Sequence, residues 1–107
     1  MNYGLPFEEL EAIKNVFRNA PEVEEVILFG SRAKGNFHPG SDIDLAAIGA
    51  GLTFDHYLSL LVALDELELL YNIDVVNYNT IKNKELLDHI HRIGITIYQR
   101  EEKKANK

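Results

Sequence analysis

The chain has 107 residues, of which 46% are hydrophobic and 26% charged, with no cysteine and a formal net charge of −6. This composition predicts one small globular domain and excludes both a disulfide framework and a cysteine zinc site. The negative charge disfavours direct nucleic-acid binding. No apolar run is long enough to span a bilayer, and the N-terminus lacks the features of a secretory signal. We therefore expect a cytoplasmic protein without a membrane segment.

The first half of the chain predicts two helical segments and two strands. Apolar residues at three- and four-residue steps indicate a helix that begins at Phe7 and ends before Pro21. The run Val23–Phe29 predicts a strand that is buried on both faces. Residues Ser31–Gly35 could form one or two helical turns, and Ile43–Ile48 is expected to be a second strand.

The second half continues the alternation of helices and strands. Thr53 is placed to cap a leucine-rich helix that extends to about Leu70, and any excess of exposed leucines there would form a partner surface. A short strand over Ile73–Val76 precedes a helix that starts near Thr80 and is capped by Gly94. Ile95–Tyr98 is the last strand. This order predicts an α/β (α+β) domain over residues 1–99, with a small mixed sheet flanked by helices, and a frayed polar tail over residues 100–107.

The first motif that carries chemistry follows the first strand, in the stretch Gly30-Ser31-Arg32-Ala33-Lys34-Gly35. Free backbone N–H groups at the start of a helix attract phosphate oxygens. Gly30 allows close approach of the backbone, and Ser31 adds a hydroxyl donor. Arg32 and Lys34 place two cations near the same anion, although surface cations on a short helix are also common. We expect a phosphate-binding turn.

The second motif consists of aspartates. Asp42 and Asp44 are two positions apart, so on a strand both side chains point to the same face. Ser41 is expected to cap or orient this loop. Asp74 lies within the apolar run Ile73–Val76, where an unpaired carboxylate would be costly. If the two strands are neighbours, three carboxylates converge and can bind a divalent cation such as Mg²⁺. Asp74 could also accept the proton of an attacking hydroxyl.

These motifs together resemble the signature of the polymerase-β-type nucleotidyltransferase superfamily. The pattern Gly-Ser-Arg-Ala-Lys-Gly followed by Ser-Asp-Ile-Asp-Leu-Ala, in so short a chain, is similar to the minimal nucleotidyltransferases. In that family these are the MNT antitoxins, encoded beside toxins with a HEPN domain. The resemblance extends from about Val23 to Tyr98 and implies a palm-like nucleotidyltransferase core.

The resemblance also implies a role for each motif residue. Asp42, Asp44 and Asp74 would be the catalytic residues and the ligands of one or two Mg²⁺ ions, and Asp74 would also be the base. Gly30 and Ser31, with Arg32, Lys34 and Ser41, would bind the nucleotide. Lys34 stands where many relatives have arginine, which keeps the charge but loses bidentate contact.

The implied reaction is transfer of AMP from ATP to a hydroxyl, such as a tyrosine of a cognate HEPN toxin. Larger relatives carry a helical domain for which this chain has no room, so another chain or the second copy of a homodimer must present the acceptor. Two other hypotheses remain open at this point. The chain could be a non-catalytic, nucleotide-binding antitoxin that neutralises its partner by binding, or it could modify a small molecule or an RNA end.

The remaining histidines and tyrosines predict no separate site. The four histidines, at positions 38, 56, 89 and 91, show no zinc-binding spacing, and we give them no functional role. Only His38 is close enough to the motif to touch a nucleotide. Tyr71 and Tyr78, on either side of the third strand, are interpreted as aromatic core or rim.

Overall fold

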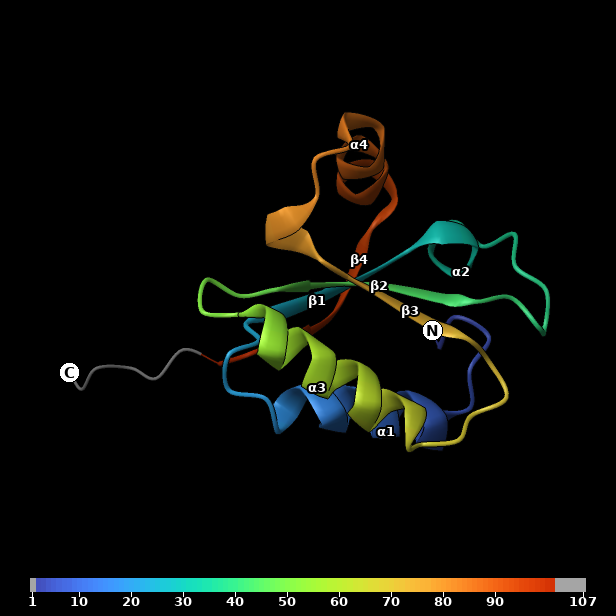
Figure 1. Cartoon of the computed structure of the whole chain (residues 1–107). Coiled ribbons are helices and arrows are strands. Elements are labelled where there is room, and N and C mark those ends of the chain that lie inside the picture. The colour runs from blue at the N-terminus through green and yellow to red at the C-terminus, as the bar shows by residue number, and fades with distance from the viewer. Residues whose placement is uncertain (1, 102–107) are drawn as a thin grey trace.

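A computed structural model describes residues 2–101 as a four-stranded sheet with helices on both faces (Figure 1). The sheet order is β3-β2-β1-β4, formed by β1 (Glu25–Phe29), β2 (Ile43–Ile48), β3 (Ile73–Asn77) and β4 (Ile95–Gln99). β1 pairs antiparallel with β2 and β4, whereas β2 and β3 are parallel. The predicted mixed sheet covered by helices is confirmed.

The larger core lies between the sheet and two long helices, α1 (Phe7–Arg18) and α3 (Phe54–Asp65). Each strand contributes alternate residues to this face, such as Val26, Leu45 and Val75. Neither helix exceeds 12 residues, and none of the described helices has the length and apolar run that a bilayer crossing requires.

The opposite face of the sheet carries α4 (Lys84–Ile93) and the short helix α2 (Gly30–Lys34), which touch each other. Phe29 and Ala46 are buried here against Ile90 of α4. β1 is therefore covered on both faces, as its continuous apolar run predicts. The part of this face over β2 and β3 that lies beyond α4 holds the polar residues considered below.

Two predicted boundaries are wrong. We expected the third helix to reach about Leu70, but α3 ends at Asp65 and Glu68 takes a positive φ of 55°. The chain turns there so that Leu69 can pack back onto the core before β3 begins. The last helix starts at Lys84 instead of near Thr80, because residues 78–80 form a single 3₁₀ turn, η1 (Tyr78–Thr80), and Asn83 caps α4.

Two predicted caps are confirmed, and the tail is only partly described. The Thr53 hydroxyl accepts a hydrogen bond from the His56 N–H at 3.1 Å, and Gly94 ends α4. Within the expected tail, Arg100 is held in place, since its guanidinium donates to carbonyls of residues 17–23. Arg100 is therefore part of the folded domain, and residues 102–107 of the predicted tail lie outside the described residues.

Candidate active site

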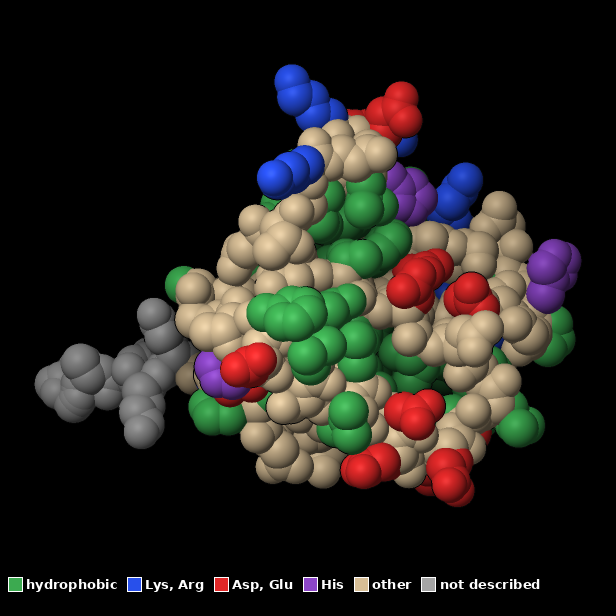
Figure 2. Space-filling model, in the orientation of Figure 1, with side chains coloured by type: hydrophobic (Ala, Val, Ile, Leu, Met, Phe, Trp, Pro, Cys, Tyr) green, Lys and Arg blue, Asp and Glu red, His purple; other side chains and the backbone are tan. Residues whose placement is uncertain are grey.

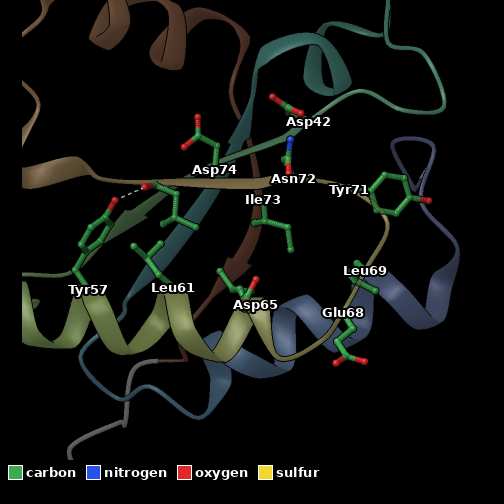
Figure 3. Close-up of a pocket in the computed structure, with 12 residues that line it drawn as sticks. Asp42, Tyr57, Leu61, Asp65, Glu68, Leu69, Tyr71, Asn72, Ile73 and Asp74 are labelled. Carbon is green, nitrogen blue, oxygen red and sulfur yellow. Dashed lines mark hydrogen bonds between the residues drawn. The ribbon is translucent and has the colours of Figure 1, made fainter.

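The three aspartates meet at one end of the sheet because β2 and β3 are parallel neighbours. Asp44 stands directly opposite Asp74 in the strand register, and Asp42 lies two residues before Asp44 on the same face. In Figure 3, Asp74 on β3 and Asp42, just before β2, both lie on the side of the sheet that faces away from α3. The sequence pattern placed Asp42 and Asp44 on one face, and the strand order adds Asp74.

The surroundings of Asp44 act on the ionisation of its carboxyl group. Partial burial raises its pKa above the ordinary value, and the negative charges of Asp74 and Asp42 raise it further. His89, on α4, acts in the opposite direction. A positive charge beside Asp44 would therefore favour its ionised form.

One argument that led to Asp74 is wrong. The apolar neighbours in the sequence suggested a costly buried carboxylate, but β3 is an edge strand and the Asp74 side chain is exposed. Its apolar neighbour Val75 is buried toward α3, whereas Asp74 points to the opposite face. Asp74 lies beside Asp44 because β3 pairs with β2, and not because a buried carboxylate needs a partner.

The donor set suits a hard divalent cation. Six carboxylate oxygens are available from the three aspartates, and none of the ion pairs formed within residues 2–101 involves them. No group of three acidic or histidine side chains in this part of the chain is arranged as a ready-made metal centre. Asp42, Asp44 and Asp74 would hold the ion, which would supply positive charge to a substrate phosphate.

The position of Gly30 beside these carboxylates leaves no room for a side chain. Its φ is +75°, and a Cβ atom at this position would collide with the Asp44 carboxylate. Phe29 is the register partner of Asp44, so the chain turns into α2 immediately next to the acidic residues. The lateral order at this end of the sheet is thus the Gly30 turn, then Asp44, then Asp74.

His89 also contacts this turn, and the sequence analysis missed it. The Gly30 N–H donates to His89 Nε2 at 3.1 Å, and the imidazole ring packs edge-on against Phe29 at 5.9 Å between ring centroids. The bond joins residues 59 positions apart in the chain, so no local pattern could have revealed it. His89 fixes the first residue of α2 from the side of α4.

The side chain of Arg32 binds backbone carbonyls of the protein itself. Its side chain is 1% exposed, and its guanidinium donates four hydrogen bonds of 2.9–3.3 Å. The acceptors are three carbonyls, those of Tyr3, Pro39 and Ser41. The guanidinium also lies 5.2 Å from the centroid of the Phe37 ring and 5.0 Å from that of Tyr71. We therefore do not include Arg32 among the proposed phosphate-binding residues.

The other predicted nucleotide ligands surround the turn without meeting at one point. Lys34 is exposed on the last turn of α2, and Ser31 is half-buried at its start. The Ser41 hydroxyl accepts the His38 N–H at 2.8 Å, and this contact orders the loop that leads to Asp42. Gly30 and Ser31 lie next to the carboxylates, whereas the roles of Lys34 and Ser41 toward a nucleotide stay predictions.

A groove of about 750 Å³ begins at Asp42 and Asp74 and runs around the edge of β3 toward α3 (Figure 3). Its far end carries Asp65 and Glu68, and its floor includes Leu61, Leu69 and Ile73. Tyr57 closes one side, since its hydroxyl donates to the Val75 carbonyl at 2.6 Å. The candidate site is thus open to a molecule that approaches over the sheet edge.

Solved structures with the same fold come from toxin–antitoxin complexes. A chain of a toxin–antitoxin complex with AMP-PNP is 24% identical, with a TM-score of 0.68 over 86% of this chain and 74% of that chain. A chain of the complex between a tri-AMPylated Shewanella oneidensis HEPN toxin and its MNT antitoxin is 21% identical, with a TM-score of 0.64 over 87% and 71%. A chain of the MntA-HepT toxin–antitoxin complex is also 21% identical, with a TM-score of 0.64 over 89% and 74%. These likenesses establish the fold.

The sequence itself matches one family model. No curated protein sequence matches the chain significantly. The model described as polymerase beta, nucleotidyltransferase, matches residues 11–103, which include the Gly30 turn and all three aspartates. This match spans most of the chain. The chain belongs to the polymerase beta nucleotidyltransferase family.

Proposed function

We propose that this protein transfers AMP from ATP, with Mg²⁺, to a hydroxyl of a HEPN-domain toxin, and that it acts as the antitoxin of that pair. The observation that carries the proposal is the register of Asp44 opposite Asp74, beside the Gly30 turn. The family accounts for nucleotidyl transfer. The choice of ATP and of a HEPN toxin rests on the AMP-PNP and AMPylated-toxin complexes among the structural neighbours.

The proposed step is an in-line displacement at the α-phosphorus of ATP. The acceptor oxygen forms a bond to the phosphorus while the bond to the pyrophosphate oxygen breaks, and pyrophosphate leaves. Asp74, exposed at the edge where the acceptor arrives, accepts the hydroxyl proton. Bound Mg²⁺ would neutralise the developing charge on the phosphates. A tyrosine is the proposed acceptor residue.

The remaining predicted groups have supporting roles in this proposal. Gly30, whose own N–H donates to His89, allows a phosphate to approach the start of α2 closely, Ser31 donates to this phosphate, and Lys34 supplies a positive charge from the end of the same helix. Ser41 keeps the loop before Asp42 in place through its contact with His38. We propose that residues 1–99 form a single minimal nucleotidyltransferase domain.

Intact mass spectrometry of the cognate HEPN toxin tests the proposal. After incubation with the parent protein, ATP and Mg²⁺, the toxin mass should rise by whole AMP units. The double variant Asp42→Asn with Asp44→Asn should leave it unchanged. Asp55→Asn is the matched control, because Asp55 is an exposed aspartate in the first turn of α3, away from the site. This control should modify the toxin as the parent does.

The same experiment separates catalysis from neutralisation by binding. An unmodified toxin that stays bound to the parent protein would overturn the proposed transfer and favour an antitoxin that acts by binding. Modification by the Asp42 and Asp44 double variant at the parent rate would remove the carboxylates from the mechanism.

A further inference from the structure

The groove beside β3 lies on the side of the carboxylates from which an acceptor has to arrive. In-line displacement requires attack opposite the leaving group. At this end of the sheet, the Gly30 turn, Asp44 and Asp74 follow one another across β1, β2 and β3. A triphosphate held at the Gly30 turn therefore places its leaving pyrophosphate on the inner side. The acceptor must then enter over the outer side, where Asp42 and Asp74 border the groove.

The charge of this half of the molecule defines what the groove can accept. Residues 35–81 include seven acidic residues and not one Lys or Arg, so the rest of the chain holds ten acids and eleven bases. The whole excess of negative charge thus lies between the start of the Asp42 loop and the end of η1. In Figure 2, the Lys and Arg side chains of the visible face lie mostly over α4 and α2, where an acidic side chain also stands, whereas the other acidic side chains are spread over the middle and lower part of this face.

The groove combines this charge with an apolar floor. Asp42 and Asp74 lie at the end of the groove where the reaction would take place, and Asp65 and Glu68 lie at the other end. Leu61 and Ile73 form part of the floor. Such a surface repels a polyanion such as RNA and attracts a cationic polypeptide. Tyr57 already satisfies the outward carbonyl of Val75, so the edge strand is capped at this point. An occupant would therefore be held through its side chains more than by strand pairing.

We propose that this groove binds a basic, extended segment of the protein acceptor and delivers its hydroxyl to Asp42, Asp44 and Asp74. The proposal rests on the proposed nucleotidyl transfer and adds a specificity determinant to it. Asp65 and Glu68 attract Lys or Arg side chains that flank the acceptor hydroxyl. The apolar residues of the floor contact the stems of these side chains.

Three neighbouring carboxylates allow a matched test. Asp65 and Glu68 line the groove, whereas Glu66, also exposed, does not. Asp65→Lys, Glu68→Lys and Glu66→Lys each change the net charge by the same amount at almost the same place. Steady-state transfer to the HEPN toxin should show a KM for the toxin raised by at least about tenfold in the two groove variants. Their kcat and their KM for ATP should match the parent, and Glu66→Lys should behave as the parent in every parameter.

Salt provides a second readout. Raising the NaCl concentration should increase the KM for the toxin with the parent protein and with Glu66→Lys, and less so with the groove variants. Equal effects of all three substitutions on the KM for the toxin would overturn the groove proposal while leaving transfer intact. If the parent transfers nothing, the proposed function fails instead. Toxin binding then tests the groove, with weaker binding by the groove variants alone supporting it and equal binding by all three refuting it.

Discussion

Replacing Arg32 by methionine should separate the structural role of this buried cation from a role in substrate binding. Methionine keeps an unbranched apolar stem but removes every donor, so three carbonyls lose their partners. Each unsatisfied buried group costs about 1–3 kcal/mol. The two aromatic contacts add about 0.5–1 kcal/mol each, and relief of charge desolvation offsets part of the loss. We expect a net loss of about 3 kcal/mol from the free energy of unfolding, a large fraction of the stability of a domain this size.

Arg100 supplies the matched control, because it makes the same kind of contacts at the other end of the molecule. Its guanidinium donates to the carbonyls of Phe17, Arg18, Ala20 and Val23. Urea unfolding followed by circular dichroism should show both Arg32→Met and Arg100→Met to be destabilised. Only Arg32 contacts the carbonyl of Ser41, the residue before Asp42. The stabilisation that added Mg²⁺ or Mn²⁺ gives the parent should therefore shrink in Arg32→Met and persist in Arg100→Met.

Two results would refute this reasoning. An unfolding free energy of Arg32→Met within about 0.5 kcal/mol of the parent would mean that the four hydrogen bonds contribute little net stability. An equal loss of cation-induced stabilisation in both variants would mean that the effect follows general destabilisation, not the position of the Asp42 loop.

Three further substitutions test other parts of the site. Burial and neighbouring charges raise the folded-state pKa of Asp44 above its ordinary value of 3.8, so the folded protein binds this proton more readily than the unfolded chain. The stabilisation that results is full below pH 3.8 and is lost as the pH rises through the folded-state pKa. Asp44→Asn should therefore be more stable than the parent at neutral pH, and thermal unfolding should no longer detect this gain in strong acid. Lower stability at neutral pH would contradict the cause assigned to the shift. Gly30→Ala should lose at least about 1 kcal/mol, since its Cβ collides with Asp44 at a positive φ, whereas Gly40→Ala, with open space around it, should unfold as the parent does. Tyr57→Phe should lose about 1 kcal/mol, because it breaks the bond to the Val75 carbonyl, and an unchanged urea midpoint would show that water replaces it.

The sequence predicted the parts of the site that depend on local periodicity. Alternation alone places Asp42 and Asp44 on one face, and the apolar run of β1 predicts its position inside the sheet. The pairing of β2 with β3 depends on contacts between segments that are distant in the sequence. The sequence could therefore predict that Asp74 lies beside Asp44 only if the two strands were assumed to be neighbours. The exposure of Asp74 depends on the same strand order, which explains why the burial argument was wrong although Asp74 does lie opposite Asp44.

Arg32 and His89 show what local patterns could not distinguish. Arg32 and Lys34 are two cations on one short helix, and nothing in the sequence reveals that the first turns inward to backbone carbonyls while the second is exposed. His89 reaches the Gly30 turn only because α4 crosses the sheet above β1. Contacts between distant segments fix the roles of both residues.

The strand order has a consequence for the timing of synthesis on the ribosome. β1 is the first strand to be translated, yet its two neighbours are β2 and β4, and β4 is the last element of the sheet. Arg100, which follows β4, also donates hydrogen bonds to carbonyls of the segment that precedes β1. A nascent chain cannot complete its sheet until about residue 100 has left the exit tunnel, so prematurely terminated products should be recognised by proteases as unfolded.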